Sequence, residues 1–185
     1  FLSIFCNTKA WAVNVGTDTT LNTDTTNIQQ NINSANVTLT NNAVLERTSG
    51  ASTVRVQKNG VTVTNNAGAS IVHSSGNSKT VKVDANSTNF TLNNSGTIST
   101  TGDRSVDMRN GSTSTINNNS GGTIKAVDQT LNFINSGGTI NNSGTLNATN
   151  GRTIISTGTS TGLSVNNNIG GVITAVSSSS TVRLD

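Results

Sequence analysis

The sequence predicts an all-β chain wound into a right-handed, single-stranded parallel β-helix, with about 24 residues and three strands in each coil. Two observations predict this fold: a short asparagine-rich motif recurs along the chain, and polar and apolar residues alternate around every copy. We call the last apolar residue before the asparagines the anchor. The anchors are Leu39, Val63, Leu92, Ile116, Ile140 and Val165, whose sequence numbers differ in turn by 24, 29, 24, 24 and 25. A nearly constant interval of this size is typical of stacked repeats.

Each anchor lies in a segment that alternates between apolar and polar residues. In the first copy Val37 and Leu39 are apolar, whereas Thr38 and Thr40 are polar. Period-two alternation predicts a strand with one buried face and one face toward solvent. Since the residue before the anchor is always Thr or Ser, we expect a column of hydroxyl side chains on the outside. Its members are Thr38, Thr62, Thr91, Thr115, Thr139 and Ser164.

An asparagine stands two positions after every anchor. If each repeat is one coil, these residues lie above one another at the strand spacing of about 4.8 Å. A carboxamide has two donors and two acceptor lone pairs, so each side chain is able to donate to the next one inside a bend. We therefore predict an internal asparagine ladder at one corner of the coil. Its members are Asn41, Asn65, Asn94, Asn118, Asn142 and Asn167.

The apolar residues fall into three groups in every coil, which predicts three strands. In the coil that starts at Asn93 the groups are Ile98, then Val106 with Met108, then Ile116. Glycines and small polar residues lie between the groups, where a corner needs a positive φ or a close backbone approach. A leucine-rich repeat would need a denser leucine pattern and a helix, and a left-handed hexapeptide solenoid would favour coils of about 18 residues.

The repeat pattern divides the chain into three parts. We expect residues 1–12 to be the remnant of a signal peptide, residues 13–36 an irregular N-terminal cap or first coil, and residues 37–185 the solenoid. Because the pattern persists to the end of the sequence, we expect the natural protein to continue further. The longest interval, between Val63 and Leu92, predicts a loop of about five extra residues, within residues 74–79 or 84–89.

The composition fits a solenoid better than a globular or disordered chain. Only 31% of the residues are hydrophobic and 10% are charged, and there is no proline. A globular domain of this composition would bury too little apolar area, whereas a disordered chain would usually carry more charge and proline. A solenoid needs only a thin apolar column. The net charge of +3 comes from basic residues scattered along the sequence, so no nucleic-acid-binding stripe is expected.

The first residues indicate export. Residues 1–6 form a short apolar run, and residues 10–12 have the small-x-small pattern that signal peptidase accepts. Cleavage after Ala12 would remove Cys6, the only cysteine, so we expect a secreted chain without disulfides. No other segment approaches the roughly 18 apolar residues needed to span a bilayer.

Four copies of the motif resemble a known family. They begin LNNSGTI at Leu92, INNNSGGTI at Ile116, INNSGTL at Ile140 and VNNNIGGVI at Val165. Over residues 37–175 the sequence resembles the coils of autotransporter passenger domains, which Gram-negative bacteria export by type V secretion. The resemblance implies a right-handed β-helix that crosses the periplasm, passes the outer membrane through a C-terminal barrel, and is displayed at the cell surface or released. Membrane contact is expected only through such a barrel.

Few residues suggest a metal, a cofactor or a covalent mechanism. His73 is the only histidine, so no histidine cluster is available to bind a metal. We expect His73 to be an exposed polar residue on a turn. Loss of Cys6 with the signal would leave no thiol nucleophile, and no glycine loop followed by a predicted helix is present to bind phosphate. The sequence therefore predicts neither a metal nor a cofactor.

Charged residues at equal offsets from the anchors fit either a surface ladder or a catalytic site. Arg104, Asp128 and Arg152 follow three successive anchors at the same offset, and we expect them to stack as a plus-minus-plus column. As a surface ladder they would contribute at most about 1 kcal/mol per pair. If the chain is a polysaccharide lyase or a tailspike-like hydrolase, Asp128 would hold sugar or metal and an arginine would act near the abstracted proton. Asp103 and Asp107 would form a carboxylate pair for hydrolysis.

The outward threonines offer a further specific possibility. Two Thr-x-Thr pairs, Thr38 with Thr40 and Thr62 with Thr64, have a spacing that resembles ice-binding solenoids. From Asn93 onward the second position becomes asparagine, which breaks the regular array. Threonine is also a common residue on the solvent side of a strand.

The sequence therefore favours a non-enzymatic stalk or adhesin that is secreted or displayed on a bacterial surface. Its expected partners are host or matrix glycans and proteins, or neighbouring cells, which it would contact through loops and outward Thr, Asn and Ser side chains. A polysaccharide-cleaving enzyme is the main alternative, although sugar clefts usually contain aromatic residues and the sequence has no Tyr. An ice-binding solenoid is the lesser alternative.

Overall fold

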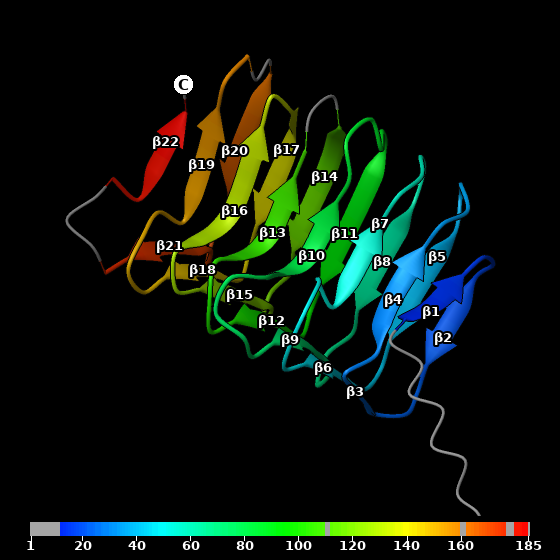
Figure 1. Ribbon diagram of the computed structural model, residues 1–185. Helices are drawn as coiled ribbons and strands as arrows, with labels where there is room; N and C mark the ends of the chain where they lie inside the picture. Colours follow the sequence, from blue (N-terminus) through cyan, green and yellow to red (C-terminus); the bar gives the residue numbers. More distant parts are fainter. Residues whose placement is uncertain (1–11, 110–111, 160–161, 177–179, 185) are drawn as a thin grey trace, which may run out of the picture.

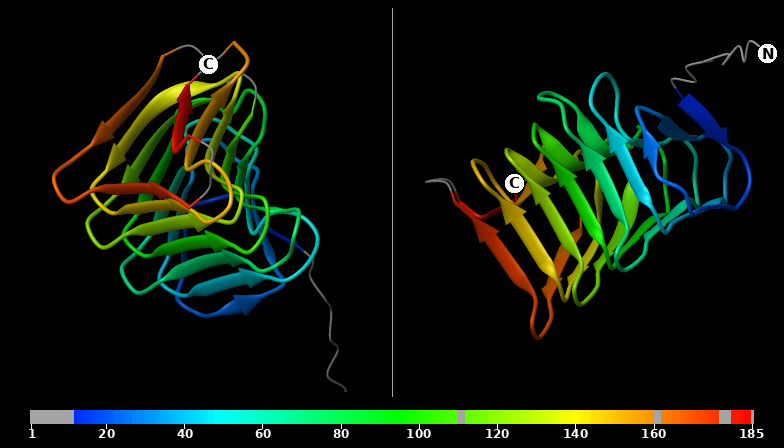
Figure 2. Two further views of the ribbon diagram at one scale, coloured as in Figure 1. Left: turned by 90° about the vertical axis from the view of Figure 1, so that its left-hand side faces the viewer. Right: turned by 90° about the horizontal axis from the view of Figure 1, so that it is seen from below.

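The computed structural model describes residues 12–109, 112–159, 162–176 and 180–184, and shows a stack of coils built from strands (Figure 1). Within these residues the chain forms twenty-two strands and no helix. Every third strand returns to the same sheet and pairs in parallel with the strand one coil away (Figure 2). The predicted fold class, a parallel β-helix with three strands per coil, is confirmed. Of residues 1–12, which we assigned to a signal peptide remnant, residues 1–11 lie outside the described residues.

Three parallel sheets form the three sides of the coil. Sheet A consists of β1 (Ala12–Val15), β4 (Gln29–Ile32), β7 (Val54–Val56), β10 (Lys79–Val83), β13 (Arg104–Met108), β16 (Gln129–Ile134), β19 (Ile154–Thr157) and β22 (Val182–Leu184). Sheet B consists of β2 (Thr19–Leu21), β5 (Thr38–Asn41), β8 (Thr62–Asn65), β11 (Phe90–Asn94), β14 (Thr113–Asn118), β17 (Gly137–Asn142) and β20 (Leu163–Asn167). Sheet C consists of β3 (Thr25–Thr26), β6 (Val44–Arg47), β9 (Ser70–His73), β12 (Thr97–Thr100), β15 (Thr123–Ala126), β18 (Thr145–Ala148) and β21 (Val172–Ala175).

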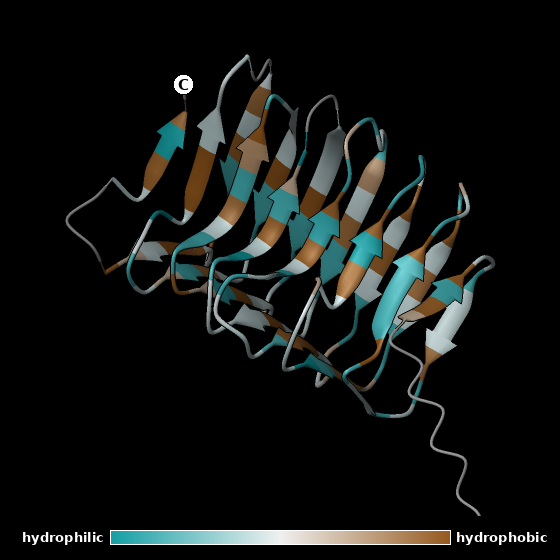
Figure 3. Cartoon of the chain, viewed as in Figure 1, coloured by the Kyte–Doolittle hydropathy of each residue, from teal (hydrophilic) through white to brown (hydrophobic). Residues whose placement is uncertain are grey.

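The core is one apolar column enclosed by the three sheets. The first five anchors are fully buried in it, and Val165 packs against it while half-buried. Along the strands, apolar residues alternate with polar ones that face outward, as the bands of Figure 3 show. Each coil contributes only a few apolar side chains, so a coil gains a core only by stacking on its neighbours.

The anchors stay in one column even where the interval between them is irregular. Val63 pairs with Leu92 across the longest interval, and Leu92 pairs with Ile116 across a shorter one. The prediction that the extra residues form one bulging loop is wrong. Relative to the next coil, two residues are added between β8 and β9, two between β9 and β10, and one between β10 and β11. Spreading the insertion over three corners keeps every strand in register.

The predicted asparagine ladder is present at the corner between sheets B and C. Each Nδ2 donates to the Oδ1 of the next ladder asparagine, over 2.8–2.9 Å. The same amides also donate to corner carbonyls, as Asn94 does to Gly96 at 3.1 Å. From Asn41 to Asn142 the ladder side chains are buried. Their hydrogen-bonding capacity is therefore used within the protein, as a buried polar group requires.

A second ladder runs along the outer face of the same strands. Asn117 donates to Asn93, Asn141 to Asn117 and Asn166 to Asn141, over 2.8–2.9 Å. Here the later residue donates to the earlier one, whereas in the inner ladder the earlier residue donates to the later one. The amide dipoles of the two ladders therefore oppose each other across the sheet. The outer ladder keeps these side chains in fixed positions on the surface.

A buried column of hydroxyl groups fastens the corner between sheets C and A. Each member donates from its Oγ atom to a backbone carbonyl of the next sheet C strand along the chain. All five members are fully buried: Thr53, Thr80, Ser105, Thr130 and Thr153. The sequence analysis did not identify this column. Its signal is a Thr or Ser directly before the first apolar residue of the middle group in five successive coils.

The chain forms a short first coil up to Gln29, where the second coil begins, so residues 13–36 include this first coil and the start of the second. Strand β1 pairs with β4 in a register that sets Ala12 opposite Gln29, so this coil contains fewer residues than any coil between later anchors. Two carboxylates join its corners to the second coil: Asp18 accepts from the backbone N–H of Thr38, and Asp24 from that of Val44, both at 2.8 Å. These bonds replace part of the backbone ladder that the shorter strands do not make.

Neighbouring asparagines provide a test of the inner ladder. We expect Asn118→Ala to lower the free energy of unfolding by about 1–3 kcal/mol, because it leaves buried amide groups of Asn94 and Asn142 without their partner. Asn117→Ala removes an outer amide beside solvent and should cost less than about 1 kcal/mol. Urea denaturation followed by far-ultraviolet circular dichroism measures both. Equal losses in the two variants would contradict the structural role of the inner ladder.

Candidate functional site

One part of the outer face of sheet A carries five of the eleven lysine and arginine residues of the chain. They lie on three neighbouring strands, β7, β10 and β13, or directly after β13. The five are Arg55, Lys79, Lys82, Arg104 and Arg109. The expectation that the basic residues are scattered is therefore wrong for this face. Residues one or two coils apart in sequence become neighbours when the coils stack.

Two pairs of like charges stand directly opposite each other on adjacent strands. Arg55 is in register with Lys82, and Lys79 is in register with Arg104. Opposed like charges on neighbouring strands repel and destabilise a sheet unless an anion lies between them. The structure places one aspartate beside each pair, so each carboxylate neutralises only one of two cations.

Asp84 and Asp103 are these carboxylates. Asp84 lies 2.6 Å from the Arg55 guanidinium and 3.0 Å from the Lys82 amine. Burial by itself raises the pKa of Asp84, but the hydrogen bonds and charges of Arg55 and Lys82 outweigh it and hold that pKa below its ordinary value. Asp103 lies 2.8 Å from the Lys79 amine and 3.4 Å from Arg104 Nε.

Asp107 is the third carboxylate of this face and is fully buried. Its Oδ1 atom accepts from Asn132 Nδ2 at 2.6 Å and lies 3.7 Å from an Arg104 nitrogen. Its Oδ2 atom accepts from Arg109 Nε at 2.6 Å. Both oxygens are therefore engaged by neighbouring side chains, which fixes the two arginines over β13.

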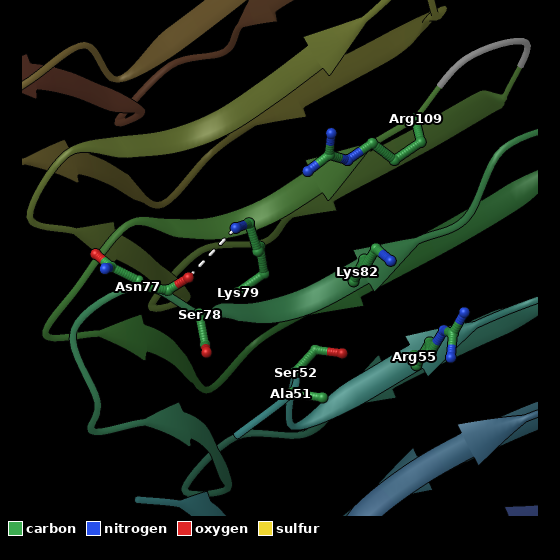
Figure 4. Close-up of a pocket in the computed structure, with 8 residues that line it drawn as sticks. All are labelled: Ala51, Ser52, Arg55, Asn77, Ser78, Lys79, Lys82 and Arg109. Atoms are coloured by element: carbon green, nitrogen blue, oxygen red, sulfur yellow. Dashed lines mark hydrogen bonds between the residues drawn. The ribbon is translucent and has the colours of Figure 1, made fainter. Parts of the chain in front are cut away.

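A groove of about 310 Å³ lies among these charges, and Figure 4 shows the residues that line it. The lining combines four cations with small polar groups from the two corners before β7 and β10. It consists of Ala51, Ser52, Arg55, Asn77, Ser78, Lys79, Lys82 and Arg109. A second hollow of about 560 Å³ shares Lys82 and Arg109 with the groove and adds Asp84 and Ala85. We call the two hollows together the trough, since both are lined by Lys82 and Arg109.

The charge column predicted from equal offsets is displaced by one residue. Arg104 pairs with Gln129, not with Asp128, and its Nε donates to Gln129 Oε1 at 2.8 Å. The corner after Asn118 holds two more residues than the corner after Asn94, and the segment from β15 to β16 is one residue shorter than that from β12 to β13. Asp128 is exposed in the corner before β16.

Of the predicted catalytic candidates, the structure brings Asp103, Arg104 and Asp107 together. It leaves Asp128 in the corner. Leu131 pairs with Ile154, so Gln129 and Arg152, each two residues earlier, are also at equivalent positions. Arg152 therefore follows Gln129 in the column that contains Arg104. The cations missed by the sequence analysis had a usable signal. Arg55 and Lys82 each stand between the two apolar residues of the middle group, the position that Asp107 holds in the next coil.

His73 lies beneath the groove and is fully buried in β9, so the expectation of an exposed turn residue is wrong. Its Nε2 atom lies 2.9 Å from the Ala51 carbonyl oxygen, and its Nδ1 atom accepts from the Ser75 N–H at 3.3 Å. These partners fit a neutral ring that donates from Nε2. Burial lowers the pKa of His73, and the charge of Arg47, the residue in register with it on β6, lowers it further.

The outer face of sheet B carries the predicted hydroxyl column. Thr38, Thr62, Thr91, Thr115, Thr139 and Ser164 are in register on successive strands. The five threonines are half-buried and Ser164 is exposed. Two positions further along the strands, Thr40 and Thr64 are followed by Asn93, Asn117 and Asn141 in the same column. This face is therefore a regular array of hydroxyl and amide groups.

Within the described ranges, no three His, Cys, Asp or Glu side chains gather as a metal site requires. The same ranges contain no apolar helix of membrane-spanning length. Comparisons with protein-family models, curated proteins and solved structures find nothing that matches the chain. The coil architecture and the chemistry of the outer faces of sheets A and B are therefore the features of this chain that bear on its function.

The buried histidine predicts a loss of stability in mild acid. Below the ordinary pKa of 6.5 the unfolded chain binds a proton that the folded His73 resists, so the free energy of unfolding should fall as pH drops below 6.5. The slope from one such group is at most about 1.4 kcal/mol per pH unit. Asp84 also stabilises the fold, but its contribution is lost only as pH falls below 3.8.

Urea denaturation at a series of pH values between about 7 and 5 measures this slope, a range set by the ordinary histidine pKa. We expect His73→Gln to be less stable at neutral pH and to have a flatter profile in that range, since glutamine does not titrate. Identical profiles for the two proteins would show that His73 does not cause the acid sensitivity.

Proposed function

We propose that this chain is a rigid, non-enzymatic stalk with adhesive outer faces, from a secreted or surface-displayed bacterial protein of the autotransporter passenger type. The observation that carries the proposal is the continuous stack: the inner ladder extends without a gap from Asn41 to Asn167. Six ladder residues at the strand spacing, with the first coil, give a rod on the order of 30 Å long. Such a rod holds its surface groups at fixed intervals.

Two features support an exported protein. The chain has one cysteine, Cys6, so no disulfide forms within it, and its stability comes from stacked backbone and side-chain hydrogen bonds and a thin core. The repeat motifs resemble autotransporter coils, as described above. A chain without internal cross-links is able to cross a membrane extended and then to fold coil upon coil.

The outer face of sheet B suits adhesion by hydrogen bonding. Its threonine hydroxyls and outer amides repeat at the strand spacing of about 4.8 Å. The outer ladder holds Asn93, Asn117 and Asn141 in fixed orientations. Binding a ligand would therefore cost little conformational entropy in these side chains. Hydroxyl and amide groups in such an array match the hydroxyls of a glycan.

The carboxylates favour binding over polysaccharide cleavage. Asp107 has both oxygens engaged and is buried, and Asp103 is held by Lys79 and Arg104. A general acid or base has to reach the proton that it transfers. The array on sheet B also favours adhesion over ice binding, because the Thr-x-Thr pairs give way to asparagine after two coils.

Beads coated with the purified chain test the proposal. We expect retention on at least one immobilised matrix glycan, matrix protein or cell surface, and loss of retention in Thr115→Arg/Thr139→Arg, which places bulky charges on the flat face. A matched control carries the same change on sheet C, Thr123→Arg/Thr145→Arg. Retention on none of the surfaces would contradict the proposal. Release of new polysaccharide ends that Asp128→Ala abolishes would support the enzyme alternative instead.

A further inference from the structure

We propose that the trough on the outer face of sheet A is a binding site for an acidic polysaccharide, whose sulfate or carboxylate groups bind Arg55, Lys79, Lys82 and Arg109. This inference rests on the proposed adhesive function and names a ligand class for a second face, opposite in chemistry to the neutral array of sheet B. Three observations carry it: a local excess of positive charge, like charges held in register, and two hollows that share Lys82 and Arg109 and have polar groups in their lining.

The charge on this face is unbalanced. Five cations meet three carboxylates, Asp84, Asp103 and Asp107, which leaves two positive charges on three strands of a chain whose net charge is +3. The ion pairs also leave part of each cation accessible. The side chains of Arg55, Lys82 and Arg109 remain 37%, 32% and 34% exposed. A ligand anion therefore has cations to contact without displacing the aspartates.

Because the strands are in register, cations recur from coil to coil along the trough, an arrangement that suits a polymeric ligand with repeated anionic groups. Arg55 and Lys82 lie opposite each other on β7 and β10, at the strand spacing of about 4.8 Å, and Arg109 comes directly after the next strand, β13. Cations so close together repel, and Asp84 neutralises only one of the two, so a ligand anion would neutralise the charge that remains. A chain that carries an anionic group on successive sugars would meet these cations in succession along the solenoid axis.

The walls of the trough favour a saccharide over a nucleic acid. Asn77 and Ser78 line it with an amide and a hydroxyl group that are at least partly exposed, and these groups are partners for sugar hydroxyls (Figure 4). None of the residues that line either hollow is aromatic, so bases would find no stacking platform. Charged groups take the place of the aromatic residues that usually bind neutral sugars, which is why the expected ligand is acidic.

The sharpest test compares two lysines of equal charge on different faces. Lys82 lines both hollows of the trough, whereas Lys125 is exposed on sheet C. The probe is a heparin hexasaccharide, titrated against the intact chain by calorimetry. We expect Lys82→Gln to raise Kd by about tenfold, the value of one charged hydrogen-bond partner. Lys125→Gln should change Kd less than about twofold, and Lys82→Arg should restore binding, since it keeps the charge.

Three further probes identify the ligand class. A galacturonate hexamer, with carboxylates and no sulfate, should bind if charge alone suffices, and its failure would restrict the site to sulfated glycans. A neutral maltohexaose should not bind at the trough. Binding of the heparin fragment should weaken as NaCl rises from about 50 to about 300 mM, because the contacts are ionic.

Several results would overturn the inference. They are no heparin binding by the unmodified chain, equal losses in Lys82→Gln and Lys125→Gln, or tighter binding of duplex DNA that also depends on Lys82. If Lys82→Gln alters the circular dichroism spectrum, Arg55→Gln replaces it, since Arg55 is the most exposed of the paired cations. If coated beads are retained on neutral surfaces but the chain does not bind heparin, the inference of an acidic-polysaccharide site is wrong and the proposed adhesive function still stands.

Discussion

The whole structure depends on vertical register, because the strands of each coil find their backbone hydrogen-bond partners in the coils above and below. Within the described residues every strand belongs to one of three parallel sheets, and no helix provides local bonds. A slip of one residue would turn each strand over and expose its apolar side chains. The inner ladder opposes such a slip, since Asn94 or Asn118 moved by one position would lose its neighbours and face solvent. The buried hydroxyls of Thr80 and Thr130 fix the corner between sheets C and A in the same way.

Register also explains how distant residues form a surface. Arg55 and Lys82 belong to different coils, more than one full repeat apart in sequence, and stand opposite each other in the sheet. The corners absorb every difference in coil length, so the faces stay regular while the corner loops vary. One outer face is neutral and repetitive, and another is charged and grooved. The same scaffold therefore presents two kinds of chemistry without any rearrangement of its core.

The sequence allowed accurate prediction where the repeat is strictest and poor prediction where the corners vary. The anchors, the asparagine ladder and the outward threonines all lie on sheet B or at its end, and their intervals are nearly constant. Counting from the same anchors failed on sheet A, because the corner after Asn118 is longer and the path to β16 is shorter, which moves Asp128 out of the Arg104 column. His73 was misplaced because polarity suggested a turn, whereas the register puts it opposite Arg47 and inside. The cationic trough was missed because only charges at equal offsets from the anchors were compared between coils, and Arg55, Lys82 and Arg109 stand at unequal offsets.

The distance between two positions of one column tests vertical register most directly. Thr38 and Thr139 are joined by four steps of the hydroxyl column, which gives a separation of about 19 Å at the strand spacing. With Cys6 replaced by Ser, spin labels at Thr38→Cys and Thr139→Cys report this distance by pulsed electron paramagnetic resonance. The account predicts a narrow distribution centred near that value, widened only by the label linkers. A broad distribution, or a centre beyond about 30 Å, would contradict the stacking of like positions, since six or more strand spacings would then separate them.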